Sequence, residues 1–346
     1  MSLSISNSDY NVRKISIRWL KIFSSVFILL FICILLFNYL YAAAPKLVEA
    51  EQEAQLTAYK IFSKKRYNVV ASGSSRINFG IDPVTMQPYF PDLSIYNCAM
   101  FGGSINKEIL DYLENRKIAW DDPKIKIVIL ELSPRVMWKQ LRKNKNYRLT
   151  VNKSPDEIAR LMRYSPDKRF SLHNLLMPMS RERWNLRKNK KIKSIPYCHP
   201  DTGWYEVVNI ASDRERDIQK RLANAKKANV SISEYDITES LNEILKKINE
   251  WTMRGVFVFG VMPPIDPRIQ VLEEKLSNYD SEKIKTLFQN AGGVVLNTSS
   301  DYNVTLGGSH LDSDEAKRFS KEIAIQIRKH ILSDLNRTKQ QPKEDK

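Results

Sequence analysis

Five short apolar segments, each followed by a helical pattern, constrain the fold of this 346-residue chain more than any other feature. The third of them is nearly all apolar, as expected of a strand that is buried on both faces of a parallel sheet. Strands that alternate with helices predict an α/β fold in which helices cover both faces of a parallel sheet. The predicted strands are residues 67–72, 93–98, 125–130, 255–260 and 293–296.

Helical patterns and one long connection complete the predicted organisation. Roughly 120 residues separate the third strand from the fourth, whereas a crossover between parallel strands needs only about a dozen. The sequence therefore predicts a large insertion, residues 135–253, within an α/β body of residues 66–335. The remaining expectations are a helical stalk over 46–65, helices over 105–116, 233–251, 271–290 and 314–335, and a polar tail over 336–346.

Positive charge is concentrated in the insertion. The whole chain carries a formal net charge of +16, and residues 139–193 hold seventeen Lys and Arg against four acids. A patch of this kind can bind nucleic acid, an anionic membrane surface or an acidic polymer, and charge alone does not separate these partners.

The N-terminal region contains an uncharged apolar run, Ile22 to Ala44, which at 1.5 Å per residue reaches about 34 Å. That length predicts a transmembrane anchor. Basic residues precede the run and glutamates follow it, so residues 1–21 are expected in the cytoplasm and the body outside the cell membrane. This single-pass topology excludes nucleic acid as a partner and favours lipid headgroups and cell-surface polymers. A cleaved signal peptide, with its cut after Ala44, is the alternative.

Cysteine and histidine usage argues against metal chemistry. The cysteines at positions 33, 98 and 198 have no paired ligand spacing, and neither His173 nor His199 has metal-ligand spacing, so no metal and no cofactor is expected. Outside the cell, Cys98 and Cys198 can oxidise to a disulfide. The alternative is that Cys98 is an ordinary buried thiol.

Candidate catalytic residues follow the predicted strands, where open α/β sheets bind their ligands. Gly73-Ser74-Ser75-Arg76 follows the first strand, so Ser75 is the candidate nucleophile. His310 is the one histidine in a loop after the last strand, and it is the candidate base. With a strand order of 2-1-3-4-5, the fourteen residues from Leu296 to His310 are long enough to bring the two together.

Together these blocks resemble the SGNH (GDSL-like) hydrolase superfamily, specifically its membrane-anchored O-acyltransferase branch, which includes alginate O-acetylation and teichoic acid D-alanyl transfer proteins. The matching residues are Gly73 to Arg76, Asn97 to Gly102 and Ser309 to Leu311. The resemblance covers roughly residues 67–135 and 254–333. It implies a three-layer, flavodoxin-like fold and a serine acyl-transfer mechanism.

Two positions depart from the family pattern. Family members usually place Asp three residues before the histidine, where this chain has Gly307. Asp301 is the nearest candidate for the third catalytic residue, because Asp312 is expected to cap the last helix. The asparagine donor of the oxyanion hole is also missing, which leaves the backbone N–H groups of Ser75 and Gly102 as the implied donors.

The resemblance implies an extracytoplasmic serine O-acyltransferase or esterase that acts on a cell-surface polysaccharide or anionic polymer. Because acyl groups come from inside the cell, it also implies a multi-span membrane-bound O-acyltransferase as partner. Gly307 leaves a second class open, a catalytically silent anchored module that binds glycan or scaffolds an export or acylation complex.

Arg76 has two interpretations, contact with an anionic substrate or pairing with a nearby carboxylate.

Overall fold

The computed structural model describes most of the body and part of the N-terminal run. The described residues are 19, 21–34, 36, 56–57, 59–100, 105–137, 194–209, 214–227, 234–277, 279–299, 301–304 and 307–340. Several predictions fall outside them: the basic segment 139–193, the second proposed oxyanion donor Gly102, and residues 37–44 of the predicted anchor.

The chain divides into two compact units, residues 1–50 with 167–191 and residues 51–166 with 192–346. In the first unit, residues 21–34 form a helix whose apolar side chains, such as Phe23 and Phe27, are exposed. Within the described residues, no helix is both long enough and apolar enough to cross a membrane.

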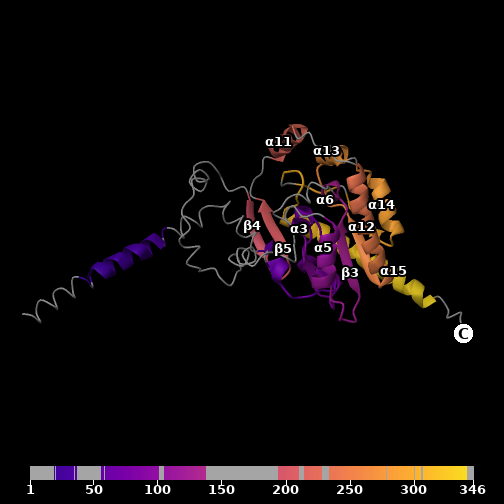
Figure 1. Ribbon diagram of the computed structural model, residues 1–346, viewed down its shortest axis with the longest axis horizontal. Helices are drawn as coiled ribbons and strands as arrows, with labels where there is room; N and C mark the ends of the chain where they lie inside the picture. The colour runs from indigo at the N-terminus through magenta and orange to yellow at the C-terminus, as the bar shows by residue number, and fades with distance from the viewer. Residues whose placement is uncertain are drawn as a thin grey trace, which may run out of the picture. The chain divides into compact units, whose positions relative to one another are not determined.

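The second unit is built on a five-stranded parallel sheet, as the sequence predicts (Figure 1). The strand order is β2-β1-β3-β6-β7. If only the five strands of this sheet are numbered along the chain, this is the expected order 2-1-3-4-5. The segment with Ser75, which follows β1, and the segment that begins at Asn97, at the end of β2, therefore lie at the ends of adjacent strands. The strands are β1 (Val69–Ser72), β2 (Ile95–Asn97), β3 (Lys126–Glu131), β6 (Val256–Val261) and β7 (Val294–Val295).

Side chains of β3 alternate between two hydrophobic cores, one on each face of the sheet. Val128 and Leu130 belong to the core under one layer of helices, whereas Ile127 and Ile129 belong to the opposite core. The first layer is α5 (Lys107–Tyr112), η2 (Leu113–Lys117), α12 (Glu234–Met253) and α14 (Ser281–Asn290). The second layer is α3 (Ser75–Gly80), α4 (Pro83–Met86) and α15 (Ser313–Gln340). The result is a three-layer α/β arrangement; η1 (Gln87–Tyr89) follows α4 directly.

The insertion between β3 and β6 contains elements that the sequence did not predict. After α6 (Pro134–Met137), an antiparallel hairpin forms from β4 (Ser194–His199) and β5 (Trp204–Asn209), followed by α11 (Arg214–Lys227). The hairpin turn contacts the edge of the sheet, because the Asn97 N–H donates to the Thr202 carbonyl at 2.8 Å. A Cβ at Gly203, where φ is +73°, would lie 2.1 Å from the Asn97 oxygen, so this approach requires glycine.

Three local predictions differ from the structure, and the first is the polar tail, because its residues 336–340 belong to α15 (Ser313–Gln340). The helix expected over 271–290 is two helices, α13 (Pro267–Ser277) and α14, because the Asp280 side chain caps α14 by accepting from Glu282 N and Lys283 N. Residues 56–57 and 59–62 of the predicted stalk are helical, but Leu56 and Lys60 are buried in the body. The end of the stalk segment is therefore part of the α/β unit.

Candidate active site

The turn between β1 and α3 places Ser75 at the first residue of a helix. Ser74 is the N-cap, and its hydroxyl accepts a hydrogen bond from Arg76 N at 3.2 Å. Gly73 is required by close packing, since a Cβ there would lie 2.6 Å from a carboxylate oxygen of Glu131. The turn thus presents Ser75 at the carboxyl end of a central strand, where an open parallel sheet binds its ligands.

The Ser75 hydroxyl lies 2.8 Å from Nε2 of His310. His310 reaches this position through a loop in which Gly307 and Gly308 adopt φ of +59° and +69°. The Phe79 ring packs against the imidazole with ring centroids 4.6 Å apart. Two residues far apart in the sequence therefore form a serine–imidazole contact at hydrogen-bond distance, the arrangement in which an imidazole can accept the proton of a nucleophilic hydroxyl.

The other ring nitrogen of His310 faces a hydroxyl. Ser309 Oγ lies 3.4 Å from Nδ1, and the same oxygen accepts a hydrogen bond from Arg221. Arg221 Nη1 also donates to the Gly307 carbonyl at 3.0 Å. A hydroxyl oxygen can accept from both Arg221 and an Nδ1–H, so Ser309 can hold the tautomer in which Nε2 is the base. Unlike an aspartate, it brings no negative charge to stabilise an imidazolium.

Asp301 is not brought to His310. Its side chain is exposed, and its hydrogen bonds run through its backbone: the N–H donates to Ser299 Oγ at 3.1 Å, and the carbonyl accepts from Arg318. Asp312 caps α15 as predicted, because its Oδ1 accepts from Glu315 N at 3.1 Å. The exposed Asp301 side chain is therefore not placed here as the orienting acid of a triad.

A buried carboxylate, Glu131, holds the nucleophile turn. Its oxygens accept from Ser74 N at 2.6 Å, from Ser74 Oγ at 3.1 Å and from the hydroxyl of Ser133. Glu131 is the last residue of β3. It satisfies polar groups of the turn directly before Ser75 and so fixes the turn in place.

Arg76 is paired inside the protein. Its Nη2 lies 2.5 Å from Glu273 Oε1, and both side chains are buried, at 1% and 8% exposure. The guanidinium Nε and Nη1 are buried without a hydrogen-bond partner. The structure thus contains the pairing with a carboxylate that was one of the two interpretations of Arg76; contact with an anionic substrate remains a proposal.

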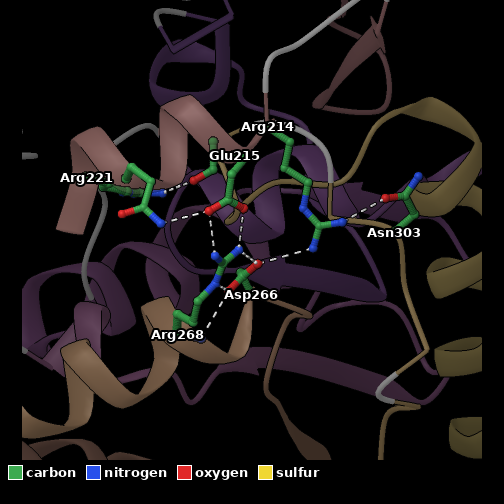
Figure 2. Close-up of polar contacts among 8 residues, drawn as sticks. Arg214, Glu215, Arg221, Asp266, Arg268 and Asn303 are labelled. Atoms are coloured by element: carbon green, nitrogen blue, oxygen red, sulfur yellow. Dashed lines mark hydrogen bonds and ion pairs between the residues drawn. The ribbon is translucent and has the colours of Figure 1, made fainter.

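A cluster of arginines and carboxylates fixes the loop that carries His310. Asp266, which follows β6, donates its backbone N–H to the Gly308 carbonyl at 2.8 Å. Its carboxylate accepts from Arg268 and Arg214, and the hydrogen bond from Arg268 is the largest cause that lowers the Asp266 pKa. Figure 2 shows the Arg268 guanidinium between Glu215 and Asp266. These contacts join α11 and α13 to the histidine loop.

The segment after β2 packs directly against the nucleophile turn. The Met100 N–H donates to the Gly73 carbonyl at 3.2 Å, and the Cys98 N–H donates to Ala71 O at 2.7 Å. Asn97 Nδ2 donates to the carbonyl of Ile77 within α3 and to that of Ile81, the C-cap of α3, at 2.8 Å each. Gly102 lies outside the described residues. The N–H of Ser75 is in the first turn of α3, where backbone donors have no partner within the helix.

No disulfide joins Cys98 to Cys198 in this structure. Among the described residues, no group of three or more His, Cys, Asp or Glu side chains is placed to hold a metal ion.

Sequence reasoning missed several residues of the site. Glu131 could have been found, because a charged residue at the end of an apolar strand lies where such sheets bind ligands. Arg221 and Asp266 carry no comparable signal, since their roles depend on contacts with the distant histidine loop.

No family model matches this chain, and comparison with curated proteins finds no match either.

Proposed function

We propose that this chain is a membrane-anchored, extracytoplasmic serine O-acyltransferase or esterase that modifies a cell-surface glycan through an acyl-enzyme. The observation that carries the proposal is the 2.8 Å contact between Ser75 Oγ and His310 Nε2 at the carboxyl ends of the parallel strands. The order of the sequence blocks and the sheet order are in keeping with the SGNH superfamily. The anchor over residues 22–44 and the basic insertion are the sequence features that support its location and its anionic partners.

In this mechanism, Ser75 Oγ attacks the acyl carbon of a donor while its proton passes to His310 Nε2. The negative charge on the tetrahedral intermediate is stabilised by the N–H groups of Ser75 and Gly102. The bond to the leaving group then breaks, and His310 returns the proton to that group. A sugar hydroxyl, or water in an esterase, attacks the acyl-enzyme by the same steps and releases Ser75. A multi-span O-acyltransferase would deliver the acyl group from inside the cell.

A serine-directed fluorophosphonate applied to the purified full chain tests the proposal. We expect one phosphonyl adduct, mapped by peptide mass spectrometry to Ser75, because the hydroxyl is already within reach of a base. His310→Ala should remove the adduct. A folded wild-type chain that takes up no phosphonate would contradict the enzyme proposal.

The second candidate function is a catalytically silent, anchored module that binds glycan or scaffolds an acylation or export complex. Two observations favour it: Gly307 occupies the position of the family's acid, and Ser309, which faces His310 Nδ1, is bound by the cation Arg221. Ser309 can orient the imidazole, but unlike the family's aspartate it carries no negative charge of its own.

Gly307→Asp, which restores the acid that the resemblance implies at this position, is expected to raise the rate of ester hydrolysis. Among the described residues, a Cβ at Gly307 would have Arg221 Nη1 as its one neighbour within 4 Å, at 4.0 Å, so the position can take a side chain without a close contact at its Cβ. Because loss of the acid costs up to about 10⁴-fold in a triad, we expect at least a roughly tenfold faster hydrolysis of a chromogenic acetyl ester.

Gly307→Asn is the matched control for this variant. It has the same shape and the same strain at φ +59°, and both residues tolerate this region better than most. Equal rates for the Asp and Asn variants would show that His310 gains nothing from a negative charge at this position.

A further inference from the structure

Lys60 is a buried amine that touches two segments of the candidate active site. Its side chain comes from the short helix over residues 59–62, and it is 1% exposed. Nζ donates to Asn78 Oδ1 at 2.6 Å and to the Ala99 carbonyl at 2.5 Å. The Lys60 carbonyl accepts from the hydroxyl of Tyr112, so the lysine backbone is also held in place.

The two acceptors belong to the parts of the protein that set the position of Ser75. Asn78 lies on α3, three residues after Ser75 and therefore on the same side of the helix about one turn away. Ala99 lies in the segment after β2, next to Met100, whose N–H donates to the Gly73 carbonyl. The amine thus joins the nucleophile helix to the segment that packs against the nucleophile turn.

This link is maintained at an energetic cost. Both acceptors of Lys60 are neutral oxygens, and no carboxylate of a described residue forms an ion pair with it. Burial is the main cause that lowers the pKa of Lys60 to about 7, with Lys117 as a smaller one; Cys98 and Cys198 act in the opposite direction. A buried amine without a counter-charge is unfavourable for folding, because the group must give up hydration or its proton.

We infer that Lys60 is a positioning residue for Ser75: its amine holds α3 and residues 98–100 in the arrangement that keeps the Ser75 hydroxyl on His310. The inference rests on the proposed function and adds a residue that the resemblance does not assign. Misplacement of a nucleophile by about 1 Å can cost on the order of 10²-fold in rate, so a tie of this kind has a measurable effect on acyl transfer.

Lys60→Met tests the inference with Lys117→Met as its matched control. Lys117 is also a fully buried lysine, at 0% exposure, but its Nζ donates a hydrogen bond to the Ser63 carbonyl at 2.8 Å instead of to α3 or residues 98–100, and its interaction with Cys98 is electrostatic only. We expect Lys60→Met to lower the rate of Ser75 phosphonylation and the kcat for a chromogenic acetyl ester on the order of 10²-fold, with KM nearly unchanged. Lys117→Met should stay within about threefold of wild type in both.

Asn78→Ala removes the same hydrogen bond by changing its acceptor on α3. It replaces Lys60→Met as the test if that variant does not fold. Because Asn78 Nδ2 has no hydrogen-bond partner, the truncation removes the bond to Lys60 and no other side-chain hydrogen bond of Asn78. If Asn78→Ala slows the reaction and the double variant Lys60→Met with Asn78→Ala is no slower, Lys60 and Asn78 position Ser75 through the same hydrogen bond.

Two outcomes would overturn the inference, and they are distinguishable. If wild type is labelled at Ser75 and the Lys60, Asn78 and Lys117 variants react at the same rate, Lys60 has no positioning role while the proposed function stands. If folded wild type is not labelled at all, the proposed function fails and the inference fails with it.

Discussion

Glu273→Ala should lower the free energy of unfolding by about 3–5 kcal/mol, because it leaves the buried Arg76 guanidinium without its carboxylate. The two side chains are 2.5 Å apart and almost entirely excluded from water. Two nitrogens of Arg76, Nε and Nη1, are already buried without a hydrogen-bond partner, so loss of Glu273 leaves the cation further unsatisfied. Urea unfolding of the full chain, compared with wild type, measures the loss.

An exposed ion pair supplies the matched control. Arg66 and Asp121 lie 3.6 Å apart with side chains 41% and 94% exposed. Asp121→Ala should therefore change the free energy of unfolding by less than about 1 kcal/mol. A Glu273→Ala variant that is no less stable than Asp121→Ala would mean that the buried pair is not structural.

The double variant Arg76→Met with Glu273→Leu separates the two interpretations of Arg76. Apolar replacement of a whole buried ion pair is often neutral or stabilising, so this protein should remain folded. If Arg76 serves the fold alone, phosphonylation of Ser75 and transfer to an anionic glycan should both persist. Loss of transfer with phosphonylation retained would instead assign Arg76 to substrate binding.

The sheet could be predicted from sequence because its strands are buried on both faces. Residues 125–130 are apolar at almost every position, and β3 lies between two strands with a helical layer on each face. The hairpin over 194–209 has no such signal, since β4 contains Pro196 and is followed by a polar turn. It is fixed by contacts with the distant residue Asn97, which local pattern cannot show.

The candidate site likewise has residues that the sequence pattern predicts and residues whose role depends on distant contacts. Ser75 and His310 were identifiable because strand ends of a parallel sheet converge, and the topology brings the two together. Asp301 was chosen for its nearness in sequence, whereas the loop leaves its side chain exposed. Lys60 and Arg221 act across long sequence separations, on α3 and on the histidine loop, so only the three-dimensional arrangement reveals them.

Ser75→Ala and His310→Ala should each reduce hydrolysis of a chromogenic acetyl ester by at least about 10³-fold, and the double variant should be no slower than either single one. The reason is that Nε2 acts only through the Ser75 hydroxyl, 2.8 Å away; once one member is lost, the other has nothing to act on. Steady-state rates of the wild type, the two single variants and the double variant form a double-mutant cycle that measures this coupling. His330→Ala, on α15 and packed against Phe259 at 5.6 Å, is the histidine control and should retain the wild-type rate. If instead the two losses multiply in the double variant, serine and histidine act independently, and the contact between them is not a catalytic dyad.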